Sequence, residues 1–148
     1  SEIELNSFIA ETLNILQTIP VAEGKYINFS ANTTPVNILA DRDKLKQVLI
    51  NLVTNACEAV STGEAISISI YKSEDRRICI SIHNGGTPIP VDILPQLTKP
   101  FFTTKASGTG LGLAIVKRIV EAHDGEFGIE SGEGVGSIVT VQLPLVLF

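Results

Sequence analysis

The sequence Gly108-Thr109-Gly110-Leu111-Gly112-Leu113 runs directly into the apolar segment Ala114-Ile115-Val116-Lys117-Arg118-Ile119-Val120. Glycine at alternate positions leaves the backbone N–H groups without side-chain cover, and the run that follows has the spacing of a helix. The first N–H groups of a helix have no partner within it and carry partial positive charge, so they attract anions. The stretch therefore predicts a phosphate-binding helix N-terminus over about 109–123. The alternative is a flexible glycine turn before a core helix.

Two familiar phosphate-binding motifs do not fit these glycines. A P-loop requires a lysine and then a serine or threonine after its last glycine, and no such pair is present here. The spacing also lacks the third glycine position and the upstream strand of the dinucleotide-binding fingerprint. Any phosphate site at this stretch is therefore of a different kind.

The composition is that of a folded globular domain. The chain has 148 residues, of which 44% are hydrophobic and 18% charged, so we expect a single domain over 1–148. Its net charge of −5 argues against broad nucleic-acid binding, so a patch for polyanions must be local and built largely from backbone amides.

The sequence also indicates the compartment in which this domain works. No apolar run is long enough to span a bilayer, and no signal peptide is recognisable. Cys57 and Cys79 both lie in apolar patterns, which favours two buried, reduced thiols over a disulfide or a metal pair. We expect a cytoplasmic domain, with no direct membrane contact of its own, whose parent protein can still be membrane-anchored.

Outside the glycine-rich stretch, helices and strands alternate. Two further helices are expected, one over Asn6 to Ile19 and one from the N-cap residue Asp41 to about Val60. The expected strands are Lys25–Ser30, Val36–Leu39 after a turn, Glu64–Tyr71, Arg76–Ile82, Glu126–Glu130 and Ser137–Leu143, the last two as a hairpin. This order predicts an α+β fold, a two-layer α/β sandwich in which about three helices cover one face of a mixed β-sheet.

The long helix carries an unusual polar stripe. Its apolar positions share one broad arc: Leu45, Val48, Leu49, Leu52, Val53, Ala56 and Val60. The opposite stripe is narrow and consists of Gln47, Asn51, Asn55 and Glu58. A solvated face is one interpretation, but asparagine is a mediocre helix former, and two of them one turn apart call for a reason. Neutral oxygen ligands suit Mg²⁺ that already carries phosphate oxygens.

A third segment, Ile82-His83-Asn84-Gly85-Gly86-Thr87-Pro88-Ile89-Pro90, ends a strand in a polar residue and two glycines. A tight turn explains the composition. The functional interpretation places Asn84 at the strand end, facing a cavity where glycine lets a flat ligand approach closely.

Together these blocks resemble the catalytic, ATP-binding domain of bacterial sensor histidine kinases, within the GHKL ATPase superfamily. The resemblance covers essentially the whole chain and follows five boxes in order: Asp41 to Ala59 (N box), Asn84 to Pro90 (G1), Lys99-Pro100-Phe101-Phe102-Thr103-Thr104-Lys105 (F), Gly108 to Leu113 (G2) and Gly134 to Pro144 (G3). It implies the Bergerat fold, the cofactors ATP and Mg²⁺, and a mobile nucleotide lid at about 91–107.

The resemblance also implies roles for single residues. Asn55 would be the Mg²⁺ ligand, with Asn51 supporting the metal and phosphates, and Lys105 would neutralise the terminal phosphate as a point charge. Phe101 and Phe102 would pin the lid. Ser137 would contact the adenine side. The implied nucleotide-binding residues are Asn51, Asn55, Asn84, Gly86, Ile89, Lys105, Gly108, Thr109, Gly110, Leu111, Gly112 and Leu113, and Asn51 and Lys105 are also the implied catalytic residues.

Two positions depart from the family pattern. The G1 box usually opens with Asp, which accepts a hydrogen bond from the adenine amino group. Asn84 can still accept it through Oδ1, but with a neutral atom, at a loss on the order of 1 kcal/mol. Its amide nitrogen can also donate to the 6-oxo group of guanine, so adenine selectivity is open. Glu58 replaces a frequent Lys or Arg, and either binds a metal-bound water or points to solvent.

The resemblance implies transfer of the ATP γ-phosphate to a histidine on a separate dimerisation domain of the same kinase, and from there to a response regulator. Neither His83 nor His123 has the sequence context of an acceptor, and His123 reads as a helix C-terminal residue. A stand-alone GHKL ATPase would need a general-base Glu where Asn51 stands. A third possibility is a protein-binding module regulated by nucleotide.

Overall fold

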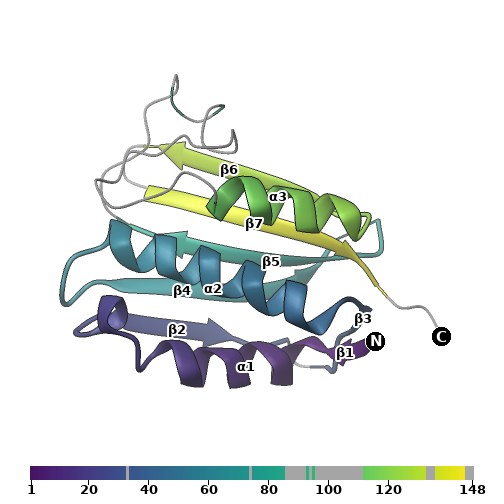
Figure 1. Cartoon of the computed structure of the whole chain (residues 1–148), viewed down its shortest axis with the longest axis horizontal. Coiled ribbons are helices and arrows are strands. Elements are labelled where there is room, and N and C mark those ends of the chain that lie inside the picture. The colour runs from purple at the N-terminus through teal and green to yellow at the C-terminus, as the bar shows by residue number, and fades with distance from the viewer. Residues whose placement is uncertain are drawn as a thin grey trace.

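The computed structural model of the chain describes residues 1–32, 34–73, 75–85, 93, 95, 112–132 and 136–145. Figure 1 shows their arrangement. The helices and strands are β1 (Glu2–Glu4), α1 (Leu5–Leu16), the 3-10 helix η1 (Pro20–Ala22), β2 (Tyr26–Ser30), β3 (Asn37–Leu39), α2 (Arg42–Ala59), β4 (Ala65–Lys72), β5 (Arg77–Asn84), α3 (Gly112–Ala122), β6 (Glu126–Gly132) and β7 (Gly136–Pro144).

Five strands form one mixed sheet in the order β2-β4-β5-β7-β6. β2 runs parallel to β4, and the other neighbours are antiparallel. Helices α1, α2 and α3 all lie on the same face of this sheet (Figure 1). The predicted two-layer α/β sandwich, with one face of a mixed sheet covered by helices, is confirmed.

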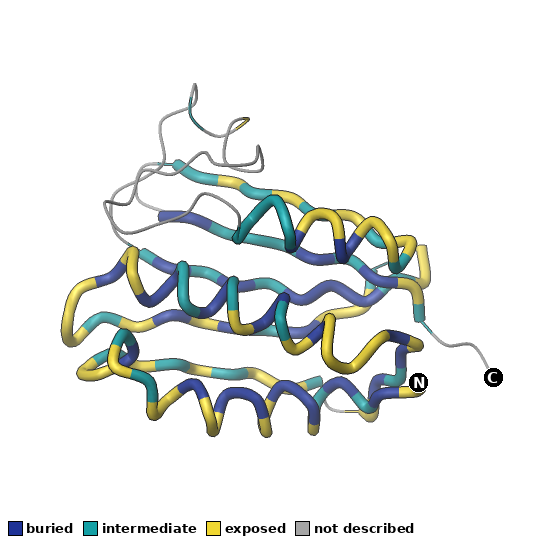
Figure 2. Tube along the Cα trace, viewed as in Figure 1, coloured by how far each residue is buried: buried dark blue, intermediate teal, exposed yellow. Residues whose placement is uncertain are grey.

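The core lies between the sheet and the helices, as the burial pattern in Figure 2 shows. Strand β4 buries every second residue, which is the period expected of a sheet with one covered face. The central strand β5 also buries Cys79 from the other face. Cys57 and Cys79 are both free and buried, as predicted, and burial raises the pKa of each thiol.

The N-terminal segment shows the main difference from the expected elements. β2 and β3 were both predicted as strands, but they belong to different sheets: β3 pairs only with β1 among the described residues. β1 was not predicted, because a three-residue strand with a single apolar side chain, Ile3, has no periodicity to recognise. Its partner lies more than thirty residues away along the chain.

Glu4 joins this small sheet to the first helix. Its carboxylate accepts hydrogen bonds from the amides of Asn6 and Ser7 and so caps the N-terminus of α1. It also accepts the amide of Val36 at 3.1 Å, which ties the segment before β3 to the start of the helix. Burial acts to raise the pKa of Glu4, but these hydrogen bonds outweigh it and hold the pKa below its ordinary value.

Helix α2 matches its prediction closely. The carboxylate of Asp41 accepts the amides of Asp43 and Lys44 at 3.0 and 3.1 Å, which is the N-cap arrangement. The helix ends at Ala59, and Lys25 Nζ donates to the carbonyl of Cys57 in its last turn at 2.6 Å. A cation at this end also complements the helix dipole. Both ends of α2 are thus fixed by side chains.

Candidate functional site

Four elements meet at one end of the sandwich, on the left in Figure 1. They are the C-terminal half of α2, the start of α3, the end of β5 and the start of β7. Helices α2 and α3 pack against each other and run in opposite directions, so the end of α3 lies beside the beginning of α2, and the start of α3 lies beside the C-terminal half of α2. The sequence predicted functional residues on all four elements.

The polar stripe of α2 is not a solvated face. Gln47, Asn51 and Asn55 are each half-buried, whereas Glu58 is exposed. The opposite arc of the helix is buried as predicted. A carboxamide offers both hydrogen-bond donors and an acceptor, and these side chains remain partly exposed, so this stripe is suited to binding a polar ligand.

Asn84 and Ser137 lie side by side at the ends of two neighbouring strands. They are register partners in the β5–β7 ladder and are the last residue of β5 and the second of β7. Asn84 is 7% exposed and Ser137 is 6% exposed, which makes them two of the three buried polar residues among those described. Asn84 alternates with Ile82 and Ile80, so its side chain faces the helix layer.

One hydrogen bond orients the Asn84 carboxamide. Its Nδ2 donates to the carbonyl of Gly85 at 2.9 Å. A carbonyl oxygen can only accept, so the nitrogen must face it and Oδ1 is turned to the other side. The structure therefore presents Oδ1 as the acceptor of this side chain.

Gly136 lies directly against this corner. A Cβ atom there would come 2.1 Å from the carbonyl oxygen of Asn84 and 2.7 Å from Cα of Gly85. Its φ of +80° is also a conformation that favours glycine. The hydroxyl of Ser131 donates to the Gly136 carbonyl at 3.0 Å and fixes the hairpin. The sequence indicated Gly136 as a hairpin glycine within the G3 box, and it did not reveal this close approach, which depends on the pairing of β5 with β7.

Helix α3 supplies two of the predicted nucleotide-binding residues. Gly112 is its first residue, and no described atom comes within 4 Å of where a Cβ would stand. Leu113 is half-buried and packs against the core. The predicted nucleotide-binding residues not yet placed, together with the two lid aromatics, lie outside the described residues: Gly86, Ile89, Phe101, Phe102, Lys105, Gly108, Thr109, Gly110 and Leu111. Of the lid at 91–107, only Ile93 and Pro95 are described.

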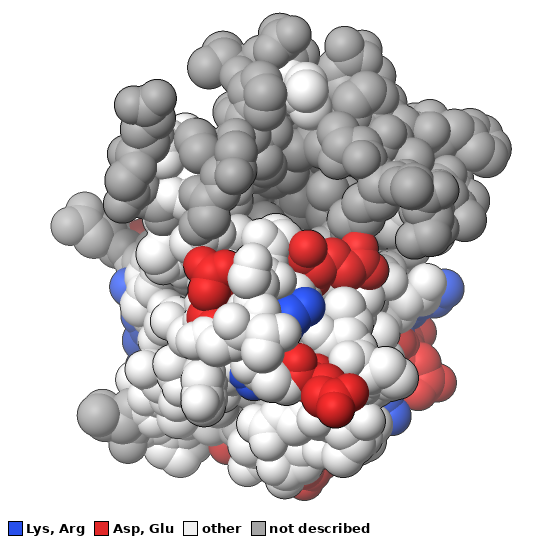
Figure 3. All heavy atoms as spheres, turned by 90° about the vertical axis from the view of Figure 1, so that its left-hand side faces the viewer, with Lys and Arg blue, Asp and Glu red and all other residues white. Residues whose placement is uncertain are grey.

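Among the described residues, this end of the molecule does not carry a basic surface patch. Figure 3 looks onto it and shows acidic side chains prominent among the described residues. Within the described ranges, no group of three or more His, Cys, Asp or Glu residues could hold a metal ion. A metal bound here would rely on neutral oxygens such as those of Asn51 and Asn55, together with oxygens of its ligand.

The same end fits a magnesium–phosphate ligand. Mg²⁺ needs few protein ligands when phosphate oxygens and water complete its coordination, and a carboxamide oxygen is an acceptable one. Asn55 is half-buried and lies one helical turn beyond Asn51 on the same stripe. Helix α3 packs against α2, and its first turn offers amides with partial positive charge.

Comparison with known families settles which protein class has this arrangement. Residues 40–147 match the model of the histidine kinase-, DNA gyrase B- and HSP90-like ATPases. The chain belongs to this family. The family is one of ATPases, so the comparison supports ATP binding by this domain, and the predicted family is confirmed.

The relatives narrow the class to histidine kinases. The chain is 39% identical over 144 residues to the sensor histidine kinase ZraS of Salmonella typhimurium, which covers 97% of the chain and 31% of ZraS. It is 41% identical over 146 residues to the histidine-protein kinase AtoS of Escherichia coli, covering 97% of the chain and 24% of AtoS. The chain thus spans about a third or less of the length of these relatives.

Solved structures agree with the sequence relatives. The catalytic domain of histidine kinase ThkA, in a nucleotide-free form, matches with a TM-score of 0.87 and 34% identity, over 97% of this chain and 94% of that one. ThkA in complex with the response regulator TrrA matches with a TM-score of 0.83 and 31% identity, over 99% of this chain and 42% of that one. This ATPase domain is of the histidine kinase type.

In the part of the chain that the structure describes, no helix is long and apolar enough to cross a bilayer.

Proposed function

We propose that residues 1–148 form one catalytic and ATP-binding domain, which binds Mg·ATP and donates the γ-phosphate to a histidine on a separate dimerisation domain of the same kinase. The observation that supports this most strongly is the half-buried carboxamide stripe on α2, beside the start of α3, in a chain of the histidine kinase type. In this proposal Asn55 ligates the metal, and Asn51 supports the metal and the phosphates.

The backbone amides of Gly108, Gly110 and Gly112 would hold the phosphates at the start of α3, and Lys105 would neutralise the terminal phosphate. Bound Mg²⁺ would neutralise charge on the phosphate oxygens. The chain itself would supply positioning and charge neutralisation, so that the acceptor imidazole approaches the γ-phosphate in line with its leaving group.

Transfer of the γ-phosphate to a partner domain explains the polar stripe better than hydrolysis of ATP does. Hydrolysis requires a general base that takes a proton from water, and the carboxamide of Asn51 cannot accept one. An imidazole nitrogen is already a nucleophile and needs no such base. The residue types on α2 therefore favour a kinase over a stand-alone ATPase.

The acceptor histidine and the downstream partner lie outside this chain in our proposal. The ring of His123 is already engaged with Asp41 and Ile119. We propose that a response-regulator receiver domain takes the phosphate from the dimerisation domain, since ThkA has been solved in complex with its response regulator TrrA. The two reduced cysteines fit the cytoplasm as the place of this reaction.

The decisive test supplies this chain, with Mg·ATP, to a separately produced dimerisation domain from the same kinase. We expect acid-labile phosphate to accumulate on that domain's histidine, and no transfer to a His→Ala version of it. Steady phosphate release by the chain alone would instead favour an ATPase. ATP binding with neither activity would favour a nucleotide-regulated binding module.

Asn84 provides a test of base selectivity. In our proposal Oδ1 of Asn84 accepts a hydrogen bond from the adenine amino group, while Nδ2 continues to donate to the Gly85 carbonyl. An Asn84→Asp substitution makes the acceptor charged and lets it repel the 6-oxo group of guanine. It also removes the hydrogen bond to the Gly85 carbonyl, but this loss affects both nucleotides and does not enter the ratio of their affinities. We expect the ratio of ATP affinity to GTP affinity to rise roughly fivefold or more, measured by calorimetric titration.

The matched control is Asn28→Asp, which makes the same chemical change on an exposed position of the edge strand β2. This control should leave the ratio unchanged. An unchanged ratio in Asn84→Asp as well would contradict the role of Asn84 in base selection.

A further inference from the structure

We propose that His123 is a positioning residue, whose ring holds the C-terminal end of α3 against the N-terminal end of α2. The proposal rests on the function proposed above, because its consequence is the placement of the two helix segments that would bind Mg·ATP. Its direct basis is two hydrogen bonds of the His123 ring, one to Asp41, which lies 82 positions away in the sequence, and one to Ile119 within α3.

The ring of His123 bridges the two helices. The backbone N–H of Asp41 donates to Nε2 at 3.0 Å, and Nδ1 lies 2.8 Å from the carbonyl oxygen of Ile119. A carbonyl oxygen can only accept a hydrogen bond, so Nδ1 must carry the proton. The N–H of Asp41 donates to Nε2, so Nε2 must be unprotonated. Both contacts together require one neutral tautomer, with one nitrogen serving each helix.

Asp41 is the N-cap residue of α2. Its carboxylate accepts the amides of Asp43 and Lys44, and its carbonyl accepts the amide of Leu45 at 2.9 Å. The backbone of Asp41 therefore cannot move without the first turn of α2. A contact from His123 to the Asp41 amide fixes the beginning of that helix relative to α3.

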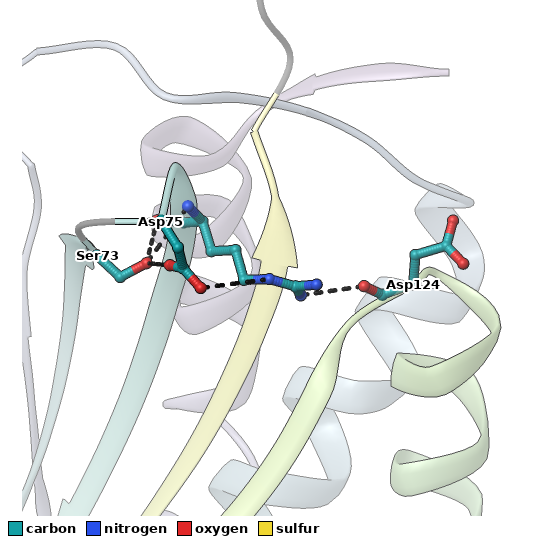
Figure 4. A network of polar contacts seen from close by, with 4 residues as sticks. Ser73, Asp75 and Asp124 are labelled. Atoms are coloured by element: carbon teal, nitrogen blue, oxygen red, sulfur yellow. Dashed lines mark hydrogen bonds and ion pairs between the residues drawn. The ribbon is translucent and has the colours of Figure 1, made fainter.

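The residue that follows His123 also has a contact with the sheet. The guanidinium of Arg77, from β5, donates to the carbonyl of Asp124 at 3.0 Å; the bond is one of the dashed lines in Figure 4. The same side chain lies 3.8 Å from the carboxylate of Asp75, which in turn contacts Ser73. The imidazole therefore joins α2 to an end of α3 whose next residue is also bonded to β5.

The lengths of the two helices relate the His123 contact to the nucleotide site. Asn51 follows Asp41 by ten residues, and Gly112 precedes His123 by eleven. At about 1.5 Å per residue these spans are about 15 and 16 Å, so antiparallel helices fixed at one end place Asn51 and the start of α3 at the same level. Loosening the His123 contact frees one helix to slide or rotate relative to the other.

Two substitutions separate the interhelical bond from the bond within α3. In His123→Gln, Oε1 can reach the position of Nε2 and still accept the Asp41 amide. In His123→Asn, the shorter side chain can donate to the Ile119 carbonyl from the position of Nδ1, but it does not reach Asp41. Both replacements are polar carboxamides, so they differ mainly in which of the two contacts they keep.

We expect His123→Asn to weaken Mg·ATP binding about tenfold, and His123→Gln to stay within about twofold of wild type. Hydrogen exchange at the Asp41 amide should be faster in His123→Asn and near wild type in His123→Gln. A thermal melt of each variant checks that it folds. The comparison of the Asn and Gln variants does not depend on a His123→Ala variant, which removes both contacts at once and can fail to fold.

Equal Mg·ATP affinity in the Asn and Gln variants, with a wild type that binds, would overturn the positioning role and leave the proposed function standing. A wild type that does not bind Mg·ATP at all would overturn the proposed function, and the positioning role with it. Faster exchange at Asp41 in both variants alike would also count against the proposal.

Discussion

An Asn55→Ala variant is expected to lose magnesium-dependent ATP binding, with affinity for Mg·ATP reduced at least about a hundredfold. Groups that only support a metal ligand commonly contribute ten- to a hundredfold to metal affinity, and we assign Asn55 a direct bond to the ion. Alanine leaves no oxygen at this position. The loss should also abolish phosphate transfer to the dimerisation domain.

The fold should survive this substitution. Alanine is a better helix former than asparagine, and Asn55 lies on the polar stripe rather than among the buried residues of α2. Asn28→Ala, on the exposed face of β2, removes the same side chain far from the site and should bind like wild type. Calorimetry with and without Mg²⁺ measures both, and Mg·ATP affinity within twofold of wild type in Asn55→Ala would contradict the assignment.

Gly136→Ala is expected to be the most destabilising of the substitutions considered. The new methyl group would meet backbone atoms of Asn84 and Gly85, which cannot rotate away as a side chain could. The φ of +80° adds strain for any residue with a Cβ. We expect a loss of about 3 kcal/mol, which lowers Tm by about 10 °C in a domain of this size.

The effect on nucleotide binding should exceed that of stability alone, because the displaced backbone carries Asn84. Gly128→Ala is the matched control: this glycine lies in the neighbouring strand β6, and no described atom stands within 4 Å of the added Cβ. Its Tm and ATP affinity should remain close to wild type. If the Tm of Gly136→Ala equals that of Gly128→Ala, the close approach of β5 and β7 described here is wrong.

The layered fold was largely predictable, because long elements carry repeated signals. The N-cap Asp41 and the apolar arc of α2 each indicate the same helix, and β4 alternates over most of its length. The short strand β1 was not predictable from its own residues. It exists through pairing with β3, and such pairing between distant segments leaves no local pattern.

The site shows the same division. The residue types on α2 and at Asn84 indicated a nucleotide site, but the spatial contacts that order it came only with the fold. The roles of Gly136 and His123 both depend on which strands and helix ends meet. Neither a turn glycine nor a histidine at a helix end reveals its distant partner in the sequence. The roles assigned to the glycine-rich stretch and to Lys105 stay predictions.

The central claim is that the stripe of α2 and the start of α3 bind one metal–triphosphate together. The most direct test replaces Mg²⁺ with paramagnetic Mn²⁺ and follows NMR line broadening when Mn·ATP is added to the labelled chain. We predict the strongest broadening at the side-chain amides of Asn55 and Asn51 and at the amide of Gly112, and little at Asn28. Broadening that is absent from these three residues, or strongest at Asn28, would contradict the account.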